Sequence, residues 1–120
     1  MARYVDGFVL PVPKRNLAGY RRMAAAAGKI WKELGAVEYV ECVGDDLKTK
    51  GMASFPRLAR AKRSETVCFS FIVYESRAHR DRVKAKVMKD PRILKMMAGK
   101  KMPFDVKRMA YGGFRAIVDL

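Results

Sequence analysis

The sequence predicts an α+β fold of the ferredoxin-like type, with a four-stranded antiparallel sheet and both long helices on one face. Three observations predict it. Segments of strand and helix periodicity alternate as strand–helix–strand, and this order occurs twice along the chain. The 120 residues suit one domain, residues 1–120, that builds its core without disulfides or metals. The residues left on the second face of the sheet are largely apolar, which predicts a homodimer in which a second copy covers that face.

The first strand is expected at Tyr4–Val12, which is rich in β-formers and contains Pro11 near its end. Strand alternation places Tyr4, Asp6, Phe8 and Leu10 on one face. Asp6 is therefore a carboxylate within an otherwise apolar strand. It is either an exposed acid at an edge or a group with a functional or ion-pairing role.

A helix is predicted over Lys14–Leu34, because apolar residues recur there at steps of three and four. Pro13 before it and Gly35 after it suit its start and its end. The following strand, Ala36–Gly44, alternates Val37, Tyr39, Glu41 and Val43 against Glu38, Val40 and Cys42.

The segment Leu47–Ser64 is expected to be a long basic loop, and loops of this length are often functional or mobile. The adjacent acids Asp45 and Asp46 precede it. One such pair without further ligands is weak evidence for a divalent cation, so turn chemistry is the preferred interpretation and we expect no metal site.

Glu65–Glu75 is the most hydrophobic stretch and is expected to be a central strand. Ser76 suits the N-cap of a helix that runs to about Lys89, with Ala78, Val83 and Val87 inward. The break at Asp90–Pro91 predicts a short helix at Arg92–Ala98, which Gly99 ends.

The stretch Met102–Phe114 has no helical period and brings aromatic, acidic and basic residues close together before Gly112–Gly113. It is either an elbow that seats a last strand at Arg115–Val118 or one wall of a small pocket. An ion pair between Asp105 and Arg108 that holds the loop is the structural alternative to a role in chemistry.

The two cysteines, Cys42 and Cys68, lie in predicted strands with no metal-binding spacing, so buried, reduced thiols in a cytoplasmic protein are expected. They fall on neighbouring strands, and the register decides whether they face each other. No apolar run is long enough for a membrane span, and no signal peptide is visible.

The formal net charge of +14 is concentrated in two segments. Residues 47–64 hold six Lys and Arg and no acid, and residues 76–102 hold ten against two acids. These segments could bind nucleic acid, an acidic partner or an anionic surface, or form a solvated face. No aromatic stacking pattern accompanies the charge, which favours the solvated face.

The chain resembles the YbaA-like family of bacterial proteins, a domain of unknown function in the dimeric α/β-barrel superfamily. The similarity spans nearly the whole chain, and its most specific part is the C-terminal stretch. The segments that carry it are YVDGFV at Tyr4–Val9, VEC at Val40–Cys42, FSFIVYES at Phe69–Ser76, Arg80–Asp81, VMKDPR at Val87–Arg92 and MPFDVKRMAYGGF at Met102–Phe114.

The resemblance implies a subunit whose sheet pairs with that of its twin, with a small-molecule site between sheet and helices. The wider superfamily includes cofactor-free monooxygenases, isomerases and haem enzymes. A cofactor-free oxygenase or isomerase needs a base and a donor for the developing enolate. Asp6 and Asp105 are the candidate bases, and Arg108, Tyr111 and His79 the candidate donors. No cofactor is expected. Haem is the least suitable, because His79 is the only histidine and lies at a helix start.

Three hypotheses stay open for the function. The first is a dimer with a pocket for an unknown small molecule, with or without catalysis. The second is binding of nucleic acid or another anionic partner through residues 47–64 and 76–102. The third is an interaction or stress-related module without catalysis.

Overall fold

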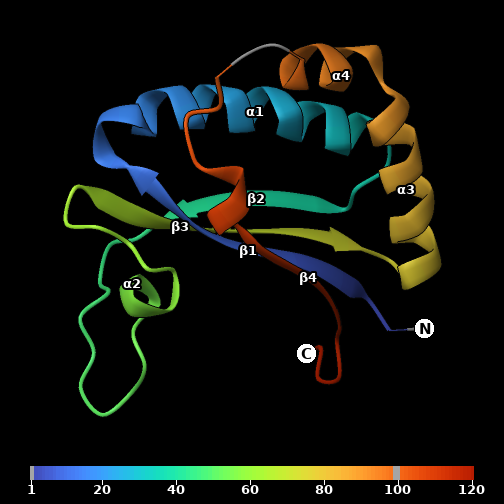
Figure 1. Cartoon of the computed structure of the whole chain (residues 1–120). Helices are drawn as coiled ribbons and strands as arrows, with labels where there is room; N and C mark the ends of the chain where they lie inside the picture. The colour runs from blue at the N-terminus through green and yellow to red at the C-terminus, as the bar shows by residue number, and fades with distance from the viewer. Residues whose placement is uncertain (1, 99–100) are drawn as a thin grey trace.

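The computed structural model, which describes residues 2–98 and 101–120, has the predicted ferredoxin-like architecture. Four antiparallel strands form one sheet in the order β2-β3-β1-β4. Helices α1, α3 and α4 lie on one side of the sheet, and α2 and the C-terminal segment lie on the other (Figure 1). The elements are β1 (Tyr4–Pro13), η1 (Lys14–Asn16), α1 (Leu17–Glu33), β2 (Glu38–Val43), α2 (Phe55–Leu58), β3 (Glu65–Tyr74), α3 (Arg77–Lys89), α4 (Pro91–Met97), η2 (Val106–Arg108) and β4 (Ala110–Arg115).

The core lies between the sheet and the helices and has two parts. One part, near α3 and α4, contains Tyr74, Val83 and Val87, and the other, near the start of α1, contains Leu10 and Tyr20. The strand alternation predicted for β1 is confirmed, since Tyr4, Asp6, Leu10 and Val12 are all buried on this face. The periodicity of the sequence gives each helix and each strand one apolar side. The core forms where the apolar sides of the helices pack against the apolar face of the sheet.

A glycine in the middle of α1 lets the helix approach the sheet closely. A Cβ atom at Gly28 would come within 2.6 Å of the Tyr39 ring on β2, which is too close for real atoms. The glycine therefore makes room for Tyr39 beneath the helix, and this position decides the shape of the site described below.

The last strand is the main correction to the predicted elements. It runs over Ala110–Arg115, and the prediction of a strand at Arg115–Val118 is wrong. Gly112 and Gly113 do not break the chain but lie within the strand, opposite Gly7 and Asp6 of β1. The buried ring of Tyr4 occupies the space where a side chain at Gly113 would be, so the glycine is required by packing.

Smaller differences have local causes. The loop at 47–64 contains the short helix α2, whose first turn Ser54 caps by accepting a hydrogen bond from the Arg57 amide. Ser76 caps α3 as predicted, but Ala78 is exposed and only Val83 and Val87 of the three predicted residues point inward. Gly99, predicted to end the short helix, and Lys100, counted in the basic segment, lie outside the described residues.

The two thiols differ in burial. Cys68 is buried on the helix-covered face, whereas Cys42 is exposed, so the prediction that both are buried is wrong for Cys42. Cys42 pairs with Phe69, the residue next to Cys68, so alternation directs the two thiols to opposite faces.

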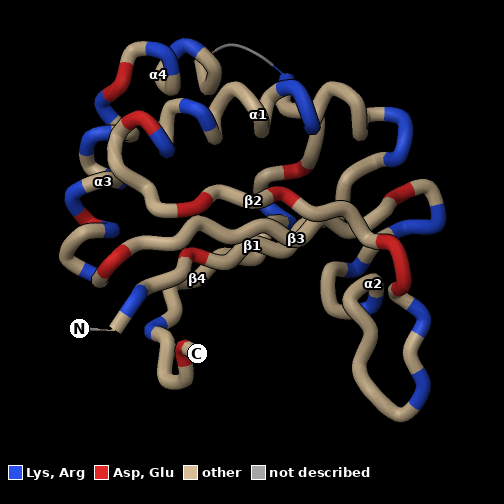
Figure 2. The backbone as a smooth tube through the Cα atoms, turned by 180° about the vertical axis from the view of Figure 1, so that it is seen from behind, with Lys and Arg blue, Asp and Glu red and all other residues tan. Residues whose placement is uncertain are grey.

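Basic residues are distributed over α3, α4 and the segment around α2 (Figure 2). Some of them are engaged within the protein, since Arg92 pairs with both Glu33 and Asp90. Nucleic-acid binding by residues 47–64 and 76–102 stays a prediction. Among the described residues, no helix is both long and apolar enough to cross a membrane.

Candidate functional site

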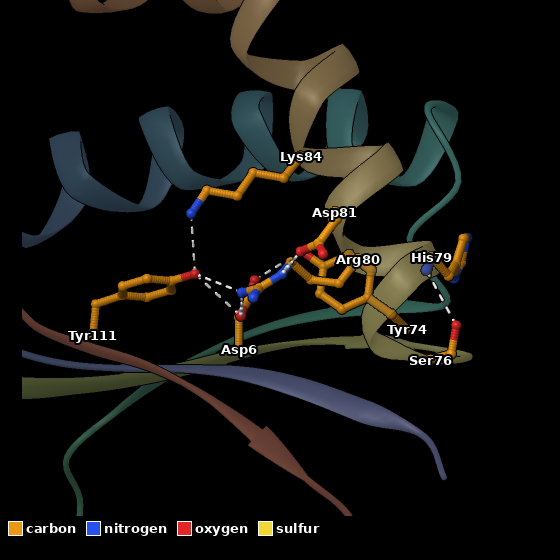
Figure 3. A network of polar contacts seen from close by, with 8 residues as sticks. All are labelled: Asp6, Tyr74, Ser76, His79, Arg80, Asp81, Lys84 and Tyr111. Atoms are coloured by element: carbon orange, nitrogen blue, oxygen red, sulfur yellow. Dashed lines mark hydrogen bonds and ion pairs between the residues drawn. The ribbon is translucent and has the colours of Figure 1, made fainter. Parts of the chain in front are cut away.

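A buried carboxylate, Asp6, lies at the centre of a polar network between the sheet and α3 (Figure 3). Only 1% of its surface is exposed. Its Oδ1 accepts from Arg80 Nη1 at 2.7 Å and from the Tyr111 hydroxyl at 3.2 Å, and its Oδ2 accepts from the Tyr74 hydroxyl at 3.1 Å. Three hydrogen-bond donors from β3, α3 and β4 therefore satisfy the Asp6 carboxylate. Without such partners, burial of this charged group would be strongly unfavourable.

Arg80 supplies the charge that balances Asp6. Its side chain is 11% exposed, and its guanidinium also lies over the Tyr4 ring, with 4.9 Å between the Cζ atom and the ring centre. Burial lowers the pKa of Arg80, but the hydrogen bond to Asp81 and the charge of Asp6 outweigh it and raise the pKa overall. Arg80 and Asp6 thus form a largely buried ion pair that fixes the position of α3 on β1.

Tyr111 connects this pair to solvent. Its hydroxyl accepts from Arg80 Nη1 at 2.9 Å and from Lys84 Nζ at 3.2 Å, and the same ammonium lies 4.9 Å from the ring centre. The register of β4 against β1 places Tyr111 opposite Phe8, with ring centres 5.0 Å apart. Tyr111 therefore lies between the polar network and the aromatic surface formed by Phe8.

The other predicted residues lie elsewhere. His79 points away from Asp6 (Figure 3), and its Nδ1 accepts from the Glu75 amide at 3.0 Å, a local cap at the start of α3. Asp105 accepts from the Lys107 amide at 3.0 Å and caps η2. Arg108 pairs with Glu65 at 2.8 Å, so the predicted Asp105–Arg108 ion pair is replaced by one that fastens the loop to β3.

A cavity lies between α1 and the sheet, and a second, which shares part of its lining, lies beside it at the β2 edge. Their volumes are about 190 Å³ and about 500 Å³. Both are lined by Tyr20, Ala24, Tyr39 and Glu41. The inner cavity is otherwise lined mainly by aromatic and aliphatic residues. Phe104 and Met109 place the 102–109 loop in its wall. The residues that line it are Phe8, Leu10, Tyr20, Met23, Ala24, Ala27, Trp31, Tyr39, Glu41, Ser70, Ile72, Phe104 and Met109.

Glu41 is the carboxylate of this cavity. Its Oε1 accepts from the Tyr20 hydroxyl at 2.7 Å and its Oε2 from the Tyr39 hydroxyl at 2.9 Å. Burial, together with the hydrogen bonds to Glu41 and its negative charge, raises the pKa of both tyrosines, so both hydroxyls stay protonated and donate. The result is an oriented carboxylate at the junction of two cavities.

Cys68 lies beside this carboxylate in the outer cavity. Burial is the main reason that the pKa of its thiol is raised to about 11, and the charge of Glu41 adds to the effect. At neutral pH the thiol is protonated and acts as a small apolar wall residue, because a thiolate is needed for nucleophilic or metal-binding roles.

Glu41 was not among the candidate residues, although one signal could have found it. It shares its face of β2 with Tyr39, as Asp6 shares its face with Tyr4 on β1, and both are carboxylates in apolar alternation. No comparable signal in the sequence identifies Arg80 and Lys84. Their helix contains many basic residues, and the sequence does not indicate which of them point inward. In the part of the chain that the structure describes, no three His, Cys, Asp or Glu side chains are grouped to hold a metal ion.

Comparison with known proteins identifies relatives along the whole chain. A family model described as "Protein of unknown function (DUF1428)" matches residues 3–106. Proteins named "Uncharacterized protein YbaA" from Escherichia coli and Shigella flexneri are 44% identical over 117 residues, which is 98% of this chain and 98% of theirs.

Solved structures share the fold at low sequence identity. A dimeric ferredoxin-like protein from an uncultured marine organism matches with a TM-score of 0.61 at 9% identity, over 100% of both chains. SnoaB, a cofactor-independent oxygenase from Streptomyces nogalater, matches with a TM-score of 0.53 at 13% identity, over 100% of this chain and 98% of its own. The likeness establishes the architecture.

Proposed function

This chain belongs to the DUF1428 family, and from its structure we propose that the cavity between α1 and the sheet binds a small, largely apolar molecule that contacts Glu41. The observation that carries the proposal is the carboxylate itself, held by two tyrosine hydroxyls where the two cavities meet. Ligand sites are typically concave and apolar, with a few polar groups that fix orientation. This cavity has both properties.

The same carboxylate is suited to proton transfer. In a cofactor-free isomerase or oxygenase, a base removes a proton from the substrate and nearby donors stabilise the anion that forms. Glu41 would accept the proton, and the hydroxyls of Tyr20 and Tyr39 are the adjacent donors. The fold shared with a cofactor-independent oxygenase is compatible with this class of reaction.

Asp6 is less suited to be the base. Its two oxygens already accept three hydrogen bonds, and it does not line either cavity. In the proposed function the Asp6 network supports the site, because it fixes Tyr111 against Phe8, which lines the inner cavity.

A second copy of the chain is proposed to cover the open face of the sheet. The face carries apolar residues from all four strands, among them Phe69 and Phe114, which are 43% and 62% exposed. Apolar patches of this kind on a sheet mark contact surfaces, and a protein of the same fold is described as dimeric.

Native mass spectrometry of the purified protein tests the binding proposal. A small molecule retained under mild conditions, and lost on denaturation, is the expected result. The Glu41→Gln variant should retain less of it, while Glu38→Gln, on the same strand but exposed on its other face, should retain the wild-type amount. If both variants hold equal amounts, Glu41 does not contact the ligand.

A further inference from the structure

The charge of the inner cavity is opposite to that of the protein. The chain has a formal net charge of +14, yet among the described residues Glu41 is the only charged one in the lining of the inner cavity. Arg21 lines the outer cavity, but no ion pair joins it to Glu41, and among the described residues Glu41 has no cationic partner within salt-bridge distance. The negative charge of Glu41 therefore stays available to a cation that enters the cavity.

The walls of the cavity are the second observation. Five aromatic residues line it together with Glu41: Phe8, Tyr20, Trp31, Tyr39 and Phe104. The faces of aromatic rings carry negative potential and attract cations, most strongly where water is excluded. Tyr20 and Phe104 meet edge to face, with ring centres 5.6 Å apart, so part of this aromatic wall is held in place by its own packing.

The carboxylate also has acceptor capacity left. Each oxygen of Glu41 accepts one tyrosine hydroxyl, and a carboxylate oxygen has two lone pairs. A ligand that donates hydrogen bonds and carries positive charge would therefore complete the coordination of Glu41 without displacing either tyrosine. An anionic ligand would face a like charge in the same cavity.

We propose that the molecule bound in this cavity is an organic cation, a small amine in its ammonium form whose charge contacts Glu41 while its carbon skeleton lies among the aromatic residues. The inference rests on the proposed function, since it requires that the cavity binds a small molecule. It adds the chemical class of that molecule.

Three probes with one skeleton test the charge directly at pH 7: benzylamine, which is protonated, benzyl alcohol, which is neutral, and benzoate, which is an anion. Trp31 lines the cavity and is the only tryptophan, so its fluorescence reports binding. We expect benzylamine to bind about tenfold more tightly than benzyl alcohol, because its ammonium group adds a positive charge to the hydrogen bond with the carboxylate, whereas the alcohol is a neutral donor. Benzoate should bind most weakly.

The variant Glu41→Gln should bring benzylamine and benzyl alcohol to within about twofold of each other and leave the affinity for benzyl alcohol nearly unchanged. Glu38→Gln is the matched control and should keep the wild-type preference. Equal affinity of the wild type for the two probes would overturn the inference while leaving a working apolar pocket. Failure of all three probes to bind would also overturn the inference. The proposed function would then still be tested separately, by whether native mass spectrometry finds a retained small molecule.

Discussion

At the scale of single residues, two carboxylates that lie between the sheet and the helices, Asp6 and Glu41, are satisfied in different ways. Asp6 is neutralised by Arg80 and hydrogen-bonded by two tyrosines, whereas the partners of Glu41 in the described part of the chain are two tyrosines and no cation. A paired buried charge is a structural element, because removing its partner leaves an uncompensated charge. An unpaired carboxylate facing a cavity is available to a ligand.

This difference predicts the effect of Asp6→Asn. The variant leaves the largely buried Arg80 with only the exposed Asp81 as a counter-charge and should lower the free energy of unfolding by about 3 kcal/mol. Urea denaturation followed by circular dichroism measures it. Asp81→Asn removes the exposed partner of the same arginine and should cost less than about 1 kcal/mol. Similar denaturation midpoints for the two variants would show that Asp6 is not the main partner of Arg80.

The pair of Arg108 and Glu65 predicts a dependence on pH. The hydrogen bonds from Arg108 lower the pKa of Glu65 from its ordinary value of 4.5 despite partial desolvation. Because the carboxyl group is more acidic in the folded chain than in the unfolded one, this contribution to stability is complete above about pH 4.5 and is lost as the pH falls through the lowered value.

Arg108→Gln should therefore unfold at a lower urea concentration than the wild type at pH 7, and the difference between the two proteins should shrink as the pH falls below about 4.5. Lys107→Gln, an exposed side chain in the same turn, is the control and should show no such convergence. A difference that stays constant down to strong acid would mean that the ion pair is not its cause.

At the scale of elements, α1 and β2 form the site together, and Gly28 sets their spacing. Glycine in an exposed helix costs about 0.5–1 kcal/mol relative to alanine, so alanine normally stabilises a helix. At Gly28 the added methyl group would displace the Tyr39 ring and with it the donor to Glu41.

Gly28→Ala should therefore lower stability by about 1–3 kcal/mol and weaken ligand retention. Gly19→Ala in the same helix has space for its methyl group and should raise stability by about 0.5–1 kcal/mol. Thermal unfolding compares the two variants, and native mass spectrometry compares their ligand content. A stabilising Gly28→Ala would show that Tyr39 moves at no cost.

The order of the elements could be predicted from the sequence, because the change from alternation to helical periodicity is local information. The position of β4 could not, because Gly112 and Gly113 have the local signal of a break. What makes them a strand is the ring of Tyr4 more than a hundred residues earlier, a contact that exists only in the fold. The candidate site is limited in the same way by contacts that exist only in the fold. Asp6 can be identified from its own strand, whereas its partner Arg80 depends on how α3 packs against the sheet.

At the scale of the whole molecule, one face of the sheet lies under three helices and the other is only partly covered by α2 (Figure 1). Phe71 lies on that second face, where it pairs with Gly7 and Val40 near the middle of the sheet. A charge placed there would be buried if a second copy packs on the face.

Phe71→Glu should therefore change the protein from dimer to monomer in analytical ultracentrifugation. Leu94→Glu replaces an exposed apolar residue on α4, outside the sheet, and should leave the dimer intact. A wild-type protein that sediments as a monomer would contradict the dimer itself, and a dimer unaffected by Phe71→Glu would place the interface on another surface.

The strand order β2-β3-β1-β4 also determines when the sheet can form. Strand β1 leaves the ribosome first, yet its two neighbours, β3 and β4, are synthesised much later, and the hydrogen bond between Asp6 and Tyr111 spans 105 residues. Contacts so distant along the chain must wait for loop closure, and folds that depend on them form slowly. Strand β1, one of the two central strands, thus stays without its partners for most of synthesis, and this is the period when the nascent chain is most exposed to aggregation.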